Sequence, residues 1–417
     1  MSQTQDQSDA SLAKQYEAYP YPQRNPNDEK QRLLIGSPSH LNEIDYWVFR
    51  GTRSTSKSLR ILVAGCGTGD GAIMIAQQMA RAKRPGEVIC LDRSQASLAI
   101  AKKRAEIRKL ENIRFIQDSL LNLPKLELGL FDYIDCCGVL HHLPNPASGL
   151  KILRDALNPG GGIGLMVYAP YGRTGVYMLQ DALAHLAPET ESPSLRLDIA
   201  KRIMRHLPAT AWLRANGNFG DHLSGGDAGL YDLLLNPRDQ AYTIKALWDL
   251  IDECDLQISG LIEPERYNPK LLVADPKIRA KMAQLDQKTQ AAIAEDLTGN
   301  MATHVVYIRR KNEPITFADP NALDSIPFMR EMPGEILAQQ IQPSNLLPFE
   351  FGTLTVMIPM LPQARGFLGM IDGKRTVGEM FDIMANRGVP KEKLPQIWQE
   401  IFEQFKNLNR VFVRSIK

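Results

Sequence analysis

The stretch VAGCGTGDG, residues 63–71, decides the fold, because a short apolar run gives way there to a series of glycines. The run RILVAG (60–65) is typical of a buried strand, and helical spacing follows it through about Lys83. Glycine is needed where a backbone turns tightly and where a large ligand must approach the main chain. The segment therefore predicts a strand, a ligand-binding turn and a helix.

Strand-like and helical segments alternate on the C-terminal side of this turn. Four more strands are predicted at EVICLD, IRFIQD, FDYIDCC and GGGIGLMVY. Helices are predicted at 94–110, where Ser94 is the N-cap, and at about 147–157. This alternation is typical of an open parallel sheet with helices on both faces. Two later segments, LQISGLI and THVVYIRR, would complete a sheet of seven strands.

The chain divides into four predicted parts. These are an N-terminal arm (1–58), the sheet domain (59–312) with a helical insertion at about 170–240, a Pro-rich linker (313–349) and a small C-terminal unit (350–417) of helices and a closing strand. A length of 417 residues, at roughly 150 residues per domain, agrees with two or three domains.

Composition argues against several classes of protein. A net charge of +2 and a hydrophobic content of 44% predict an ordinary globular chain with no nucleic-acid partner. No segment approaches the apolar length of a membrane span, and the polar N-terminus does not resemble a signal peptide. The five cysteines lack metal-ligand spacing, so we expect a cytoplasmic protein without a metal site.

The spacing of the glycines bears on the ligand. Gly65, Gly67 and Gly69 form G-x-G-x-G, whereas the dinucleotide fingerprint needs glycine where this chain has Asp70. A carboxylate would repel a pyrophosphate but suits a ligand that carries an ammonium group. The residues therefore favour S-adenosylmethionine (SAM) over NAD, bound at the C-terminal edge of the sheet.

Five segments together resemble the class I SAM-dependent methyltransferase family. They are VAGCGTGDG, ICLDRS, FIQDSLLNLP, FDYIDCCGVLHHLPNP and ALNPGGGIGLMVY, and they follow the family's order over residues 60–168. The resemblance implies a Rossmann-like α/β fold with a seven-stranded sheet, SAM as cofactor and a methyl-transfer activity.

The resemblance also implies which residues bind the cofactor. The loop Gly65, Cys66, Gly67, Thr68 and Gly69 would pass under the methionine part of SAM, with Asp70 near its amino group. The other implied contacts are Asp92 with the ribose hydroxyls, Arg93, Asp118 and Ser119 with the adenine, and Gly138 and Val139 beside the reacting methyl group.

Catalytic candidates are sparse, because methyl transfer asks mainly for positioning of the acceptor and, where needed, a base. His141 and His142 lie where such a base could sit, although such a pair also serves loop packing or cofactor contact. Tyr171 is a third candidate, because the segment YAPYGRTGVY leaves the fifth strand at the same edge of the sheet.

Substrate-binding candidates come from three segments. Tyr19 and Tyr21 lie in the aromatic leader YEAYPYPQR, which would either close over the cofactor or pack as a structural arm. Arg173 would either pair with an acidic group of the substrate or brace the insertion. His222, in the glycine-rich part of the insertion, is a weaker candidate.

The C-terminal unit is similar to small winged-helix peptide-recognition domains of the PqqD type. The similarity depends on one short motif, IDGKRTVGEM, residues 371–380. Such a domain would hold a peptide by strand addition. The alternative is a module for packing or oligomerisation, and the sequence leaves a homo-oligomer open.

Three functions agree with these observations. The first is methyl transfer to a protein or peptide side chain, with nitrogen as the favoured acceptor, although the N-P-P-Y motif of amide and adenine N-methyltransferases is replaced by CGVL. The second is methylation of a small molecule such as a metabolite, quinone or lipid, since the HHLPNP loop is common in such enzymes. The third is SAM binding without turnover.

Overall fold

A seven-stranded sheet forms the centre of the computed structural model, which describes residues 15–217, 220 and 225–415. The strand order is β3-β2-β1-β4-β5-β7-β6. The strands are β1 (Leu59–Ala64), β2 (Gly86–Asp92), β3 (Ile113–Gln117), β4 (Phe131–Cys137), β5 (Leu157–Tyr168), β6 (Leu256–Ile262) and β7 (Thr303–Arg310). All seven predicted strands are confirmed. The parallel arrangement holds except for β7, which lies between β5 and β6 and runs antiparallel to both.

Helices cover both faces of the sheet, and alternate residues of each strand face opposite cores. Ile61 and Val63 pack toward α3 (Asp70–Arg81) and α4 (Gln95–Ile107). Leu62 and Ala64 pack toward the other face. That face is covered by α5 (Pro146–Asp155), α11 (Ile244–Glu253) and α13 (Gln287–Thr298), while η3 (Leu120–Lys125) and η4 (Leu140–His142) are short turns after β3 and β4.

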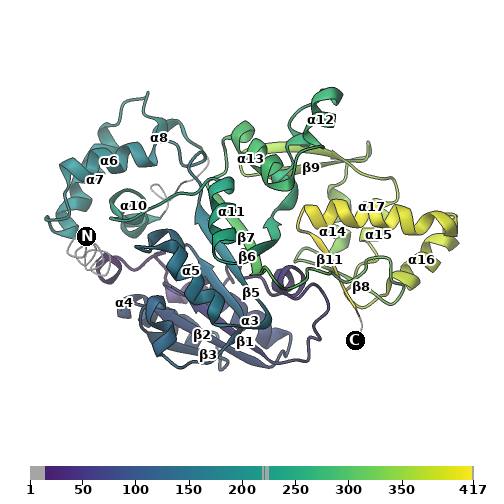
Figure 1. Cartoon of the computed structure of the whole chain (residues 1–417), viewed down its shortest axis with the longest axis horizontal. Coiled ribbons are helices and arrows are strands. Elements are labelled where there is room, and N and C mark those ends of the chain that lie inside the picture. Colours follow the sequence, from purple (N-terminus) through teal and green to yellow (C-terminus); the bar gives the residue numbers. More distant parts are fainter. Residues whose placement is uncertain (1–14, 218–219, 221–224, 416–417) are drawn as a thin grey trace.

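The predicted insertion after β5 is a helical subdomain with its own apolar cluster. Its described helices are α6 (Val176–Leu186), α7 (Pro193–His206), α8 (Trp212–Ala215) and α10 (Gly226–Leu235). Figure 1 shows it at the opposite end of the molecule from the C-terminal helices. Between β6 and β7 the chain forms η5 (Pro264–Tyr267), η6 (Pro269–Leu271) and α12 (Pro276–Met282).

The C-terminal part begins earlier than we predicted. Its elements are β8 (Ile326–Met329), α14 (Gly334–Gln340), β9 (Leu346–Phe351), β10 (Leu354–Pro359), α15 (Ala364–Leu368), α16 (Val377–Asn386), η7 (Lys391–Lys393), α17 (Leu394–Asn407) and β11 (Val411–Arg414). The linker expected at 313–349 is corrected here, because it contains β8 and α14 and because β8 pairs with β11. The partner strand is remote in sequence and β8 contains a proline, so the local pattern did not reveal it. The winged-helix resemblance stays a prediction.

The N-terminal arm lies between the sheet and the C-terminal part. It contains η1 (Pro26–Lys30), α2 (Leu41–Glu43) and the π-helical turn η2 (Ile44–Val48). The ring of Tyr46 stacks on Phe412 of β11 with centroids 4.8 Å apart, and Trp47 packs where a side chain on Gly260 of β6 would lie. One continuous apolar cluster therefore joins the α3 face of the sheet to the C-terminal helices. No described helix has the length and apolar character to cross a membrane.

Candidate functional site

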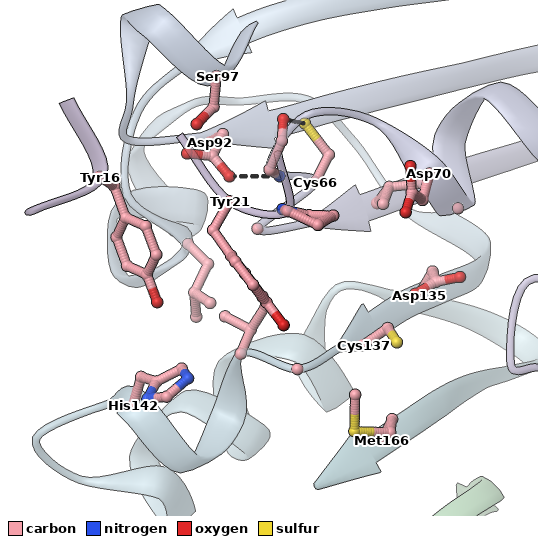
Figure 2. A pocket seen from close by; sticks show the side chains of 18 of the residues that line it. Tyr16, Tyr21, Cys66, Asp70, Asp92, Ser97, Asp135, Cys137, His142 and Met166 are labelled. Atoms are coloured by element: carbon pink, nitrogen blue, oxygen red, sulfur yellow. Dashed lines mark hydrogen bonds between the residues drawn. The ribbon is translucent and has the colours of Figure 1, made fainter. Parts of the chain in front are cut away.

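A cavity of about 760 Å³ opens at the C-terminal edge of β1, β2, β4 and β5. The N-terminal arm covers it, and Figure 2 shows Tyr21 of the arm projecting into the cavity. Most of the residues implied to bind the cofactor line it: Gly65, Cys66, Gly67, Asp70, Asp92, Arg93, Asp118, Ser119, Gly138 and Val139. The cavity thus lies where an open α/β sheet binds its ligand.

The glycine loop after β1 has a backbone that requires glycine. Gly65, Gly67 and Gly69 have φ values of +74°, +51° and +100°, which other residues rarely adopt. A Cβ atom on Gly67 would lie 2.6 Å from the carbonyl oxygen of Tyr21. The arm therefore rests directly on the loop, and Thr68 Oγ1 fixes it further by donating to the carbonyl of Pro22 over 2.7 Å.

Asp92 ends β2 and supports the loop. Its Oδ2 accepts the Gly67 amide at 2.7 Å, and its Oδ1 accepts the Ser94 amide at 2.9 Å. Burial raises the pKa of this carboxyl group, against the lowering effect of these two amides. A carboxylate at the end of β2 is a strong acceptor for the two hydroxyls of a ribose, so the geometry fits an adenosyl ligand.

The turn after β3 provides the other end of the cavity. Asp118 is half-buried and accepts the Ser119 amide at 2.6 Å and Asn122 Nδ2 at 2.8 Å. These hydrogen bonds lower the pKa of Asp118. Opposite the glycine loop, Val139 packs its methyl groups where a side chain on Gly65 would lie. The cavity is therefore narrow at the loop and polar at the β3 turn.

Asp70 does not stand free beside the cavity as the sequence suggested. Its Oδ2 pairs with Arg24 of the arm at 2.6 Å, and its Oδ1 pairs with Arg104 of α4 at 2.6 Å. Burial raises the pKa of Asp70, but the two arginines lower it more, so that the net direction is down. Asp70 lines the cavity with its charge already paired by two guanidinium groups, and its role beside the amino group of SAM stays a prediction.

The two adjacent histidines lie in different surroundings. His142 lines the cavity, and its Nδ1 lies 2.6 Å from the carbonyl oxygen of Arg238. A carbonyl oxygen can only accept, so in the neutral ring Nδ1 carries the proton and Nε2 has the lone pair. His141 is fully buried behind it against the ring of Tyr168, and burial lowers its pKa well below the usual value. Only His142 has the position of a base.

The remaining candidates also differ in whether they line the cavity. Arg173 lines the cavity but is buried, and it pairs with Asp239 at 3.0 Å and lies over the ring of Tyr168. Tyr171 is 39% exposed and does not line the cavity. Gly172, between these two residues, packs against the backbone of Met301 and Ala302. Tyr171 is therefore poorly placed for the catalytic role that we predicted.

In the arm, Tyr21 lines the cavity, whereas Tyr19 stacks on Tyr231 of α10 with centroids 5.1 Å apart. The prediction for His222 lies outside the described residues.

Sequence reasoning missed the residue that joins the arm to the insertion. Asp232 of α10 is buried and accepts the hydroxyl of Tyr16 at 3.0 Å and that of Tyr168 at 3.3 Å. Since Tyr16 and Tyr168 also line the cavity, the arm, β5 and the insertion meet at this carboxylate. Tyr16 and Asp232 are 216 residues apart, so no local pattern could have paired them.

The ion pair between Arg24 and Asp70 holds the arm over the cavity, so we expect the arm to slow the release of the ligand. Arg24→Ala should weaken SAM binding about three- to tenfold, because a half-buried ion pair contributes about 1 kcal/mol to holding the arm down. Titration calorimetry measures the affinity, and stopped-flow dilution measures the release rate. Arg32→Ala is the matched control, since Arg32 lies in the same arm and is exposed. Equal affinities for the two variants would contradict the prediction.

Comparison with known proteins relates part of the sheet domain to a known family. Residues 55–191 match the family described as a methyltransferase domain. An uncharacterised protein of Synechococcus sp. is 29% identical over 308 residues, which cover 72% of this chain and 71% of that protein. The ubiquinone biosynthesis O-methyltransferase of Acinetobacter baumannii is 32% identical over 102 residues, which cover 24% of this chain and 40% of that enzyme.

A solved structure has a similar fold over nearly the whole length of this chain. PKMT2 from Rickettsia typhi superposes with a TM-score of 0.60 and 15% identity over 91% of this chain and 75% of its own. A structure of the same protein with AdoHcy gives a TM-score of 0.59 over 91% and 76% of the two chains. At this identity the likeness concerns the fold, including the parts outside the sheet domain.

Proposed function

We propose that this chain, a class I SAM-dependent methyltransferase, transfers the methyl group to a nitrogen atom of a protein side chain. When bound, SAM supplies an activated methyl group, so the residues of the chain need chiefly to hold and orient the two reactants. Asp92 would hold the ribose, the glycine loop would pass under the methionine part, and Tyr21 would cover it. The positions of these residues around the cavity support these roles.

The proposal of a protein substrate is supported chiefly by a direct connection between the cavity and the C-terminal part. Ser37 of the arm lines the cavity, and its hydroxyl donates to Glu43 Oε1 over 2.7 Å. The same carboxylate pairs with Arg330 and accepts Asn409 Nδ2 at 2.7 Å. A part that is tied to the cavity by one carboxylate is well placed to present a bulky substrate, and a small substrate would not need it.

A nitrogen acceptor agrees with the polar groups at the cavity. A protonated amine must lose a proton before it can attack the methyl group, and His142 Nε2 would accept it. His142 lines the cavity beside Arg238 and Tyr168, on the side where β5 ends. This assignment makes His142 the base and leaves His141 as a packing residue.

The second candidate is methylation of a small molecule. The observation that favours it is the match to ubiquinone biosynthesis O-methyltransferases, which covers 40% of the first of those enzymes. A small acceptor would occupy the same cavity and would leave the C-terminal part without a role in recognition.

Tritium transfer separates the two candidates. The full chain is incubated with methyl-tritiated SAM and a lysate of its source organism, and the products are resolved by gel electrophoresis and by solvent extraction. We expect counts in a discrete protein band, and an excess of S-adenosylhomocysteine (SAH) should abolish them. Counts confined to the extract would overturn the protein substrate in favour of the small molecule. SAM binding with no transfer at all would indicate a binding protein without turnover.

A further inference from the structure

One carboxylate at the cavity differs from the others. Asp135 lies near the end of β4, its side chain is completely buried, and it lines the cavity. Its Oδ2 accepts the hydroxyl of Ser39 at 2.5 Å. Its Oδ1 is buried and accepts no hydrogen bond of normal geometry from the described residues, although the amide of Cys137 lies near enough to lower the pKa of the carboxyl group. A buried carboxylate oxygen without a donor is costly, so Oδ1 would gain from a donor supplied by a ligand.

The other acids at the cavity already have their donors from the chain. Asp70 has two arginines, and three further carboxylates accept backbone amides: Glu17 from Gln95 and Ala96, Asp92 from Gly67 and Ser94, and Asp118 from Ser119. Among the described residues that line the cavity, Asp135 Oδ1 is the one buried side-chain oxygen that lacks a donor. Asp135 is therefore the acid that remains for a ligand.

Asp135 lies beside the first turn of α3, near the expected methionine end of the SAM site. A Cβ atom on Gly71, in the first turn of α3, would lie 3.3 Å from Asp135 Oδ2 and 2.5 Å from Ser39 Oγ. One turn further along α3, Met74 contacts the amide of Gly36 through its sulfur at 3.3 Å. Figure 2 shows Asp135 and Cys137 on β4, with Met166 of β5 nearby, and Asp92 and Tyr16 toward the other side of the view.

We propose that Asp135, supported by Ser39, binds a primary ammonium group at the end of an aliphatic chain. A positively charged donor matches a carboxylate that forms no ion pair with an arginine or lysine of the described chain, and an aliphatic chain matches the side chains of Met74 and Met166 that line the same cavity. Two ammonium groups have this chemistry. One is the α-ammonium of SAM, and the other is the amine acceptor, a lysine-type side chain.

The protonation state of Asp135 agrees with this role. Burial raises its pKa to about 6, while the hydroxyl of Ser39 and the amide of Cys137 act in the opposite direction. The carboxyl group is thus mainly ionised at pH 7.5, and it gains most from a partner that brings a positive charge. If the ammonium group belongs to the amine acceptor, the inference rests on the proposed methylation of a protein side chain. If it is the α-ammonium of SAM, the inference does not depend on that substrate.

Two binding experiments on the full chain test the proposal. In the first, calorimetry compares SAH with its des-amino analogue, in which hydrogen replaces the α-amino group. Wild-type protein should prefer SAH at least tenfold, and in Asp135→Asn that preference should fall to near onefold. In the second, n-butylammonium, which reproduces the end of a lysine side chain, is titrated into SAH-loaded protein. If the acceptor is the source, wild-type protein binds it and Asp135→Asn binds at least tenfold more weakly.

Each outcome of these two experiments either supports or overturns the proposal. Loss of the amino-group preference supports the proposal with the cofactor as source, and loss of n-butylammonium binding supports it with the acceptor as source. If Asp135→Asn changes neither, or if wild-type protein shows neither, the proposal is overturned. Both experiments measure binding, so a failure of methyl transfer to proteins would leave them valid.

Two further variants guard against a structural effect. Asp132→Asn is the matched control, because Asp132 lies on the same strand but pairs with Arg53 at 3.0 Å outside the cavity. Ser39→Ala should reduce the same ligand preference by a smaller factor, about threefold, because it removes the hydroxyl that orients the carboxylate. Because Asp135→Asn removes a buried charge, we expect the Asp135→Asn protein to fold at least as stably as the wild type.

Discussion

Asp92→Ala should lower the affinity for SAM about a hundredfold. The substitution removes the acceptor for the two ribose hydroxyls, and hydrogen bonds to a charged group contribute about 1.5–3 kcal/mol each. It also releases the Gly67 amide, which Asp92 holds at 2.7 Å, so the loop loses its support. The two effects together correspond to at least 2.8 kcal/mol, or about a hundredfold in affinity. Titration calorimetry with SAM and SAH measures it.

Two other substitutions show whether the effect belongs to the carboxylate. Asp92→Asn keeps an acceptor for the Gly67 amide but loses the charge, so we expect a loss of about tenfold. Glu87→Ala should leave the affinity unchanged, because Glu87 lies at the other end of β2 and pairs with Arg60 at 3.0 Å. If Asp92→Ala binds SAM as tightly as the wild type does, the end of β2 is not the ribose site.

The sheet and the glycine loop could be predicted because their signals are local. Each strand of the sheet is a short apolar run, and the helix after β2 begins at Ser94, whose side chain caps the amide of Ser97. The positive φ angles at Gly65, Gly67 and Gly69 leave little choice of residue, so the loop is visible in one stretch of sequence. Asp92 follows directly from the position at which the second strand ends.

The partners of charged groups could not be predicted, because they come from remote segments. Asp70 pairs with Arg24 and Arg104, and the sequence of the loop does not indicate either partner. The histidine pair shows a different limit. His141 and His142 lie in a single turn of three residues, η4, and only the packing of the neighbouring Tyr168 decides which ring faces the cavity.

Residues around Asp135 show how a local pattern can hide a site. In the sequence, FDYIDCC is an apolar run typical of a buried strand, and its second aspartate looks like an interruption of that strand. In the structure the strand is buried on both faces, and the aspartate faces the arm and the cavity. The signal that was available is the carboxylate itself, since an acid inside such a run needs a partner.

Glu43→Ala should lower the free energy of unfolding by about 3–5 kcal/mol at pH 7.5, because it leaves the largely buried guanidinium group of Arg330 with only an exposed counter-charge and removes the acceptor of buried hydrogen bonds. Glu43 is fully buried, pairs with Arg330 of the C-terminal part and accepts the hydroxyl of Tyr307 in β7 at 2.7 Å. Denaturant unfolding followed by tryptophan fluorescence measures the change. Glu331→Ala is the matched control, since Glu331 pairs with the same arginine at 3.1 Å but is 47% exposed, and it should cost less than about 1 kcal/mol.

The pH dependence of this loss separates a charge effect from a packing effect. Burial raises the pKa of Glu43, but Arg330 and the hydrogen bonds lower it more, so the net pKa lies below its usual value. A depressed carboxyl pKa stabilises the fold above the pKa of the unfolded chain and loses that contribution as the pH falls through the folded value. The difference between wild type and Glu43→Gln should therefore shrink below about pH 4.

The location of Glu43 determines what its loss should do to the molecule as a whole. The carboxylate joins the arm, the sheet and the C-terminal part, and one apolar cluster surrounds all three. We therefore expect wild-type protein to unfold in one transition, and we expect Glu43→Ala to move that transition to lower denaturant without splitting it. A separate early transition of the C-terminal helices would contradict the shared core. It would also weaken the argument that this part presents the substrate to the cavity.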